Sequence, residues 1–231
     1  MLVIFCLKTH SEINEQENKM NLSDSAVIGR FTLAAGISAL IQIILLTLMF
    51  AVSRSPYGRI SDYFYVLTPL LILPLFLMIR KFQGEQSSDI SLIIQIIGVI
   101  GILIASLAQV VLLFKIIDFK QSIWGNSIGL GLIGIPILVL SLINFGNSNL
   151  PASFNWFGVI LGVVMAVGIP AVFFFIDEFF ALSHSGGLDW ASVNPLFYPA
   201  VLAGVLTQIG LPVWLIWAAK LILSGNLKFF G

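Results

Sequence analysis

Six long stretches of almost uninterrupted apolar residues dominate this sequence and limit what it can fold into. Each reaches the ~20 residues that an α-helix needs to cross ~30 Å of hydrocarbon. Lipid offers no partner to an exposed backbone amide, and the runs lack the alternation of a membrane β-barrel, so helices are predicted. The predicted spans are approximately 26–52, 61–79, 89–114, 123–145, 154–180 and 196–222.

The composition supports the same fold class. The chain is 58% hydrophobic and 10% charged, whereas a soluble domain is ~45–50% apolar and ~25% charged. We therefore predict an all-α protein, a polytopic bundle of six transmembrane helices with no soluble domain. The lipid bilayer is its expected partner, and a protein partner or a second copy of the chain is a further candidate. A net charge of zero gives no indication of a nucleic-acid partner.

The two ends of the chain differ from the spans. Residues 1–25 are predicted as a polar N-terminal tail, and 223–231 as a short C-terminal tail. Met20 is an alternative start, because NLSDSAVIGRF after it is typical of the beginning of a helix, with Ser23 or Asp24 as the N-cap.

The distribution of basic residues predicts the orientation. Side A, which holds both termini, carries seven: Lys8, Lys19, Arg30, Arg80, Lys81, Lys220 and Lys228. Side B carries four: Arg54, Arg59, Lys115 and Lys120. The excess predicts a multi-pass protein of the cell (cytoplasmic) membrane with both termini in the cytoplasm. Without the tail residues Lys8 and Lys19 the ratio is five to four.

Asp177 and Glu178 stand side by side at the end of the fifth apolar stretch. Asp177 is 21 residues after Trp156, which is ~31 Å of helix and about one hydrocarbon thickness. With Trp156 at the side-A interface, Asp177 lies at the side-B interface, where a carboxylate costs little. The alternative is a buried working carboxylate.

A candidate polar site on side B combines two connections. The first, SRSPYGRISDYFY, is predicted as a turn in which Ser61 and Asp62 cap the second helix. The second holds a polar loop whose carboxylates and imidazole are ligand types for a metal, but no HExxH spacing occurs, so we predict a solvated loop and no metal. The candidate residues are Asp177, Glu178, His184, Asp189, Arg59 and Asp62.

Four glutamines lie inside the spans: Gln42, Gln95, Gln109 and Gln208. Gln95 and Gln109 are 14 residues apart, close to four turns, so they share one face of the third helix. Amides in lipid lack partners, which directs such a stripe inward. Interhelical hydrogen bonding is one interpretation of this stripe, and a polar path or ligand pocket is the other.

No lysine, arginine or histidine lies in the middle of a span. This disfavours b-type haem, retinal binding, voltage sensing and proton-coupled transport, which rely on such residues or on buried acids. No cofactor is predicted. Two GxxxG pairs, Gly125 with Gly129 and Gly158 with Gly162, predict close helix packing.

A GRF sequence at 29–31, then SPYGRISDYF, then LILPLFLMI, resembles a group of uncharacterised bacterial six-helix membrane proteins. The resemblance covers roughly 26–82. It implies the six-helix plan and no activity or catalytic residue.

Three functions remain open from the sequence. The first is a non-enzymatic membrane protein that acts through partners or lipids. The second is a small transporter or channel component with a glutamine-lined path. The third is a membrane enzyme with its site on side B, although no catalytic constellation is present. A cavity reaching Gln95 or Gln109 favours the second, and convergence of Asp177 or Glu178 with His184 and Arg59 favours the third.

Overall fold

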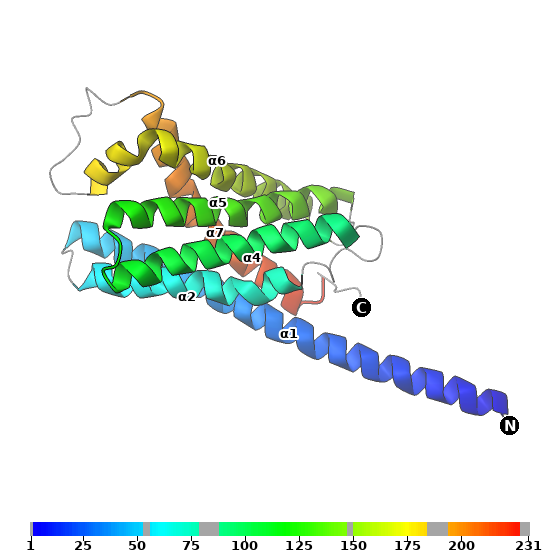
Figure 1. Ribbon diagram of the computed structural model, residues 1–231. Helices are drawn as coiled ribbons and strands as arrows, with labels where there is room; N and C mark the ends of the chain where they lie inside the picture. Colours follow the sequence, from blue (N-terminus) through cyan, green and yellow to red (C-terminus); the bar gives the residue numbers. More distant parts are fainter. Residues whose placement is uncertain (1, 53–55, 79–87, 147–149, 184–193, 227–231) are drawn as a thin grey trace.

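The computed structural model describes residues 2–52, 56–78, 88–146, 150–183 and 194–226, and within them the chain is helical with no strand (Figure 1). The predicted all-α fold class with six membrane-length helices is confirmed. The helices are α1 (Leu2–Ala51), α2 (Tyr57–Leu77), α4 (Ser88–Leu113), α5 (Phe119–Ile143), α6 (Ala152–Ser183) and α7 (Phe197–Leu223), with a short 3₁₀ helix η2 (Asn144–Gly146) after α5.

The six α-helices form a closed ring in chain order. Each packs against the next one along the sequence, and α7 packs against α1. Neighbours are antiparallel, so α1 begins and α7 ends at the same end of the bundle (Figure 1). We call this end side A and the opposite end side B, as in the sequence. Side chains from all six helices point toward the central axis of the ring. The residues that occupy this central region differ between the two ends.

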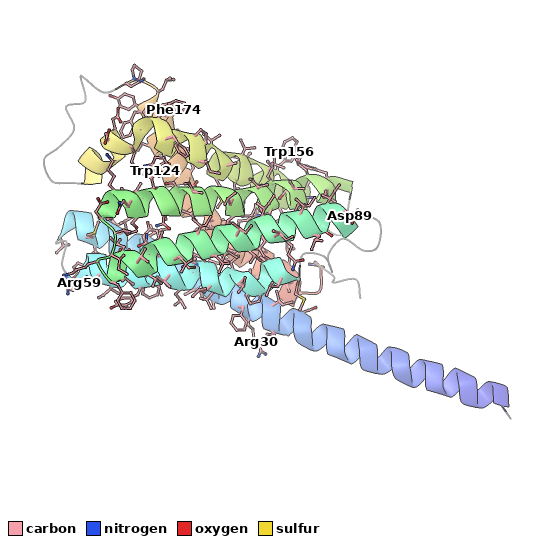
Figure 2. All side chains as sticks on the ribbon, viewed as in Figure 1. Arg30, Arg59, Asp89, Trp124, Trp156 and Phe174 are labelled. Atoms are coloured by element: carbon pink, nitrogen blue, oxygen red, sulfur yellow. The ribbon has the colours of Figure 1, made fainter. Side chains whose placement is uncertain are left out.

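The outer surface of the ring is apolar on every helix. Large exposed hydrophobic side chains include Ile44, Leu67, Leu107, Leu142, Ile160 and Ile209. A soluble monomer rarely exposes a continuous apolar surface larger than a few hundred Å². Figure 2 places Trp124 toward side B and Trp156 toward side A. Aromatic side chains at both ends are typical of membrane interfaces.

The side-A half of the axis is filled by a hydrophobic core. Its most deeply buried members come from five helices: Ile72, Phe76, Ile102, Ile133, Ile137, Met165 and Leu215. Phe154 stacks on Trp214 with ring centroids 5.6 Å apart. These large side chains leave the side-A half closed.

The predicted close approach at glycines is confirmed. A Cβ added to Gly129 would lie 2.6 Å from the backbone nitrogen of Ala105 on α4. One added to Gly162 would lie 2.6 Å from the backbone nitrogen of Leu138 on α5. Only hydrogen fits at both positions, so the backbone of α5 packs directly against the backbone of α4 on one side and of α6 on the other.

Two predicted helix caps are wrong. Helix α1 runs without a break from Leu2 to Ala51, so neither Ser23 nor Asp24 begins it. The segment before them contains no glycine or proline, and it is rich in good helix formers. Helix α2 begins at Tyr57 with Pro56 as its N-cap, which places Ser61 and Asp62 in the second turn. Neither side chain therefore caps the helix.

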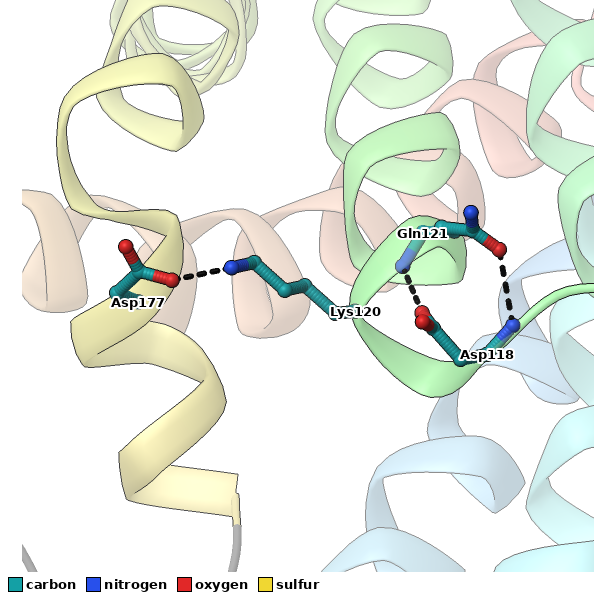
Figure 3. Close-up of polar contacts among 4 residues, drawn as sticks. All are labelled: Asp118, Lys120, Gln121 and Asp177. Carbon is teal, nitrogen blue, oxygen red and sulfur yellow. Dashed lines mark hydrogen bonds and ion pairs between the residues drawn. The ribbon is translucent and has the colours of Figure 1, made fainter.

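Helix α5 begins at Phe119, before the predicted start at 123. Asp118 is its N-cap: its carboxylate accepts a hydrogen bond from the Gln121 backbone, and the Gln121 side chain accepts one from the Asp118 backbone (Figure 3). This reciprocal pair is a capping box. The extra turn brings Ser122 into the bundle.

Candidate functional site

The side-B half of the ring contains a cavity of about 180 Å³, which we call the side-B chamber. Its lining includes residues in the terminal turns of three helices, Met49 of α1, Gly58 of α2 and Phe119 of α5, so it extends to the side-B end of the bundle. Its polar lining comes from four helices: Ser61, Asp62 and Tyr65 of α2, Gln109 of α4, Ser122, Asn126 and Ser127 of α5, and Gln208 of α7.

The floor of the chamber is a hydrogen-bonded chain across three helices. The Gln42 amide on α1 donates to the Gln208 carbonyl at 3.2 Å, and the Gln208 amide donates to the Tyr65 hydroxyl at 3.2 Å. Gln208 is the twelfth residue of α7, which begins at Phe197, so it lies about 17 Å along the helix, near the middle of a ~30 Å hydrocarbon layer. The chamber therefore reaches roughly half-way through the bundle.

Two buried polar side chains of the lining have unused hydrogen-bonding capacity. Gln109 is 4% exposed, and Ser61 is 2% exposed. The Gln109 amide donates to Ser122 at 3.0 Å. However, the Gln109 carbonyl oxygen and the Ser61 hydroxyl have no hydrogen-bond partner among the described residues. Leaving such groups unpaired costs ~1–3 kcal/mol each, so a polar occupant of the chamber is favoured.

Asp62 is the charged residue of the chamber lining. It lies in the second turn of α2 and is half-buried. Within the described residues no ion pair or hydrogen bond involves its carboxylate. A carboxylate inside a membrane span is expensive unless it faces a polar cavity or a partner. Its position on the chamber wall satisfies that condition.

Asp177 lies at the side-B end of α6, on a kinked segment. The backbone of Phe175 is non-helical (φ −129°, ψ 22°). Beyond the kink, Asp177 forms an ion pair with Lys120 in the first turn of α5 (Figure 3). The Asp177 side chain is 79% exposed. Asp177 therefore lies at the side-B end of the bundle, and its depth in a membrane stays a prediction.

The remaining side-B candidates do not join Asp177 in the described part of the chain. Glu178 is half-buried on the neighbouring position of α6. Arg59 is exposed on α2, at the side-B end (Figure 2), and no ion pair links it to Asp177. His184 and Asp189 lie outside the described residues. Of the six predicted residues, Asp62 alone contributes to the chamber lining as described.

The glutamines separate into two groups. Gln42, Gln109 and Gln208 surround the chamber or the small hollow of about 20 Å³ that adjoins it. Gln95 lies toward side A, where its amide donates at 3.0 Å to the carbonyl of Leu77, the last residue of α2. A helix end leaves such carbonyls without intrahelical partners. Gln95 therefore ties α4 to α2 and takes no part in the chamber.

Sequence reasoning missed Asn126, Ser122 and Ser127. The predicted fourth span begins at 123, which leaves Ser122 outside it, whereas α5 begins at Phe119 and includes all three residues. Ser122 and Asn126 are four residues apart and share a helix face. That spacing is the feature of the sequence that indicates a polar helix face here.

A second hollow of about 110 Å³ adjoins the chamber between α6 and α7. It shares Ile123, Ser127, Leu130 and Gln208 with the chamber lining. Its walls carry Gly168 and Gly204, and a Cβ built on either glycine would meet no atom within 4 Å. The side-B half is therefore loosely filled beyond the chamber itself. Across the described residues, no three His, Cys, Asp or Glu side chains gather to hold a metal ion.

The fold and the site define a class of protein: a multi-pass helical membrane protein with a chamber in one half of its bundle that is lined in part by polar side chains. The chain matches no family model, no curated protein sequence and no solved structure. The resemblance to uncharacterised bacterial six-helix membrane proteins stays a prediction. The chamber is therefore the feature that bears on function.

Proposed function

We propose that the protein is a small membrane transporter that binds a polar solute in the side-B chamber. The observation that carries this proposal is the chamber itself, which gathers polar side chains from four helices, extends to side B and ends near mid-depth against the apolar core. Solute sites of transporters lie near the bilayer midplane between helices. A path open at one end and closed at the other is what such a protein needs in one of its two states.

Prolines beside the chamber support a change between states. Pro69 of α2 and Pro212 of α7 both line the small hollow under the chamber floor. Each removes a backbone hydrogen bond within a helix and favours a hinge. Because α2 and α7 also carry Asp62, Tyr65 and Gln208, bending at these prolines would move chamber residues relative to the filled side-A core.

The proposal includes a location. The excess of basic residues on side A supports the cell membrane with both ends of the chain on the cytoplasmic side. The chamber then faces the outside of the cell. The enzyme hypothesis gains no support from the described contacts, because Asp177 pairs with Lys120 and not with Arg59.

Thiol labelling tests this proposal. In a Cys6→Ser background, Gln208→Cys places a thiol at the chamber floor, and Leu215→Cys places one in the apolar core, where Leu215 is 0% exposed. Each variant is reconstituted in liposomes and exposed to a membrane-impermeant methanethiosulfonate from one side at a time.

We expect labelling of Gln208→Cys from side B and, more slowly, from side A, because a transporter exposes its site to both sides. Leu215→Cys should resist labelling from side B. Absence of labelling at position 208 from either side would contradict a solvated chamber. Labelling from side B alone would contradict transport.

A further inference from the structure

We propose that the side-B chamber takes a small organic ammonium cation, with the Asp62 carboxylate as its counter-ion. This inference rests on the proposed function in so far as the chamber must admit solute from side B. It goes further by naming the charge, the hydrogen-bonding character and the size of that solute.

The charge follows from the chamber lining. Asp62 is the charged side chain among the described lining residues, and it has no partner of opposite sign there. The nearby basic residues are directed elsewhere: Lys120 pairs with Asp177, and Arg59 is exposed. A cationic solute would neutralise Asp62, whereas an anion would face an uncompensated carboxylate in a partly desolvated site.

The buried atoms of the wall that lack a partner suit a donor. The Gln109 amide donates one N–H to Ser122, and the Gln208 amide donates one to Tyr65. The deeply buried lining atoms without a partner are the Gln109 carbonyl oxygen, which only accepts, and the Ser61 hydroxyl, which can accept or donate. An ammonium group supplies several N–H donors, and bonds from a charged donor are roughly twice as strong as neutral ones.

The size of the chamber favours an organic cation over a metal ion. A cavity of 150 Å³ holds benzene, so about 180 Å³ admits a solute of a similar or slightly larger size. The described lining offers one carboxylate, which balances the single charge of an ammonium group and not the double charge of a calcium ion. The rings of Tyr65 and Phe119 belong to the same wall, and aromatic faces attract organic ammonium groups.

Three probes of matched shape test the inference. They are the ammonium form of 4-aminobutan-1-ol, its neutral isostere butane-1,4-diol, and the anion 4-hydroxybutanoate. Binding to the full chain, purified in a neutral detergent, is measured by calorimetric titration at one ionic strength. We expect the dissociation constant of the ammonium probe to be about tenfold or more below that of the diol. The anion should bind more weakly than the diol.

Asp62→Asn keeps the shape of the side chain and removes its charge. It should bring the ratio of the two dissociation constants close to one. Asp177→Asn, a carboxylate on the same side but outside the chamber lining, should leave the ratio unchanged. If Asp62→Asn does not fold, the comparison of the three probes on the native chain still decides the matter.

Equal binding of diol and ammonium, tighter binding of the anion, no binding of any of the three probes, or a ratio unaffected by Asp62→Asn would each overturn the inference. None of these outcomes changes the expected thiol labelling of Gln208→Cys, which depends on access to the chamber and not on the charge of the solute. Failure of the inference and failure of the proposed transport function are therefore distinguishable.

Discussion

The two halves of the helix ring are built from the same six helices and are filled in opposite ways. Toward side A, large apolar side chains such as Phe76 and Trp214 meet on the axis. Toward side B, Asp62, Gln109, Asn126 and other polar side chains lie among apolar ones around a chamber. The contrast shows that a membrane bundle can be hollowed at one end while the other end holds its helices together.

Helix association in lipid depends on close packing and not on exclusion of water from apolar surface. The side-A core and the glycine contacts of α4, α5 and α6 supply that packing. This division frees the side-B half to carry polar groups that would weaken a bundle if they lay at its main contact.

The largest difference between the halves is expected for a truncated phenylalanine. Phe76 is 0% exposed in the side-A core, and Phe119, at the chamber mouth, is 40% exposed. Phe76→Ala should lower the free energy of unfolding by about 3–5 kcal/mol because it leaves a cavity in a filled region. Phe119→Ala should cost clearly less, because a side chain that is 40% exposed loses less buried surface. Unfolding in mixed micelles measures both, and equal losses would remove the distinction.

An intermediate effect is expected for added methyl groups. Gly162→Ala places a Cβ 2.6 Å from the backbone of Leu138, while Gly204→Ala meets no atom within 4 Å. The first should destabilise the fold by about 1–3 kcal/mol through overpacking. The second should be neutral, or stabilising by up to about 1 kcal/mol, since alanine is the better helix former. Thermal unfolding of both variants in one detergent makes the comparison, and a larger loss at position 204 would contradict it.

The smallest effects belong to the side-B rim. Asp118→Ala removes the capping box of α5 and should cost about 1 kcal/mol. Asp177→Asn breaks a mostly exposed ion pair with Lys120 and should cost less than about 1 kcal/mol. A double-mutant cycle with Lys120→Met isolates the coupling. A coupling free energy well above about 1 kcal/mol would contradict this expectation. It would show that the ion pair stabilises the kinked end of α6 more than its solvent exposure indicates.

The number of helices followed from the sequence, because long apolar runs leave few alternatives in lipid. The inward direction of Gln109 also followed from its polarity. The helix beginnings did not: at Ser61 and at Asp24, residues with good capping chemistry lie inside helices that start earlier. A cap depends on where neighbouring turns find partners, and composition alone does not decide that.

The grouping of chamber residues was also beyond the sequence. Gln42 and Gln208 are 166 positions apart, yet they share a hydrogen bond. Gln95 and Gln109 lie on one helix face and serve different ends of the bundle. Which polar side chains meet depends on the closed ring, because the ring determines which helices are neighbours and which side chains face its axis.

Closure of the ring by α7 on α1 has a consequence during synthesis. Because α1 is synthesised before α7, it gains its second neighbour in the ring only after α7 has entered the membrane. Until α7 arrives, the amide of Gln42 lacks the carbonyl that it donates to in the finished protein. A chain truncated before α7 would leave that amide without this acceptor, and an unpaired amide inside a membrane span is costly.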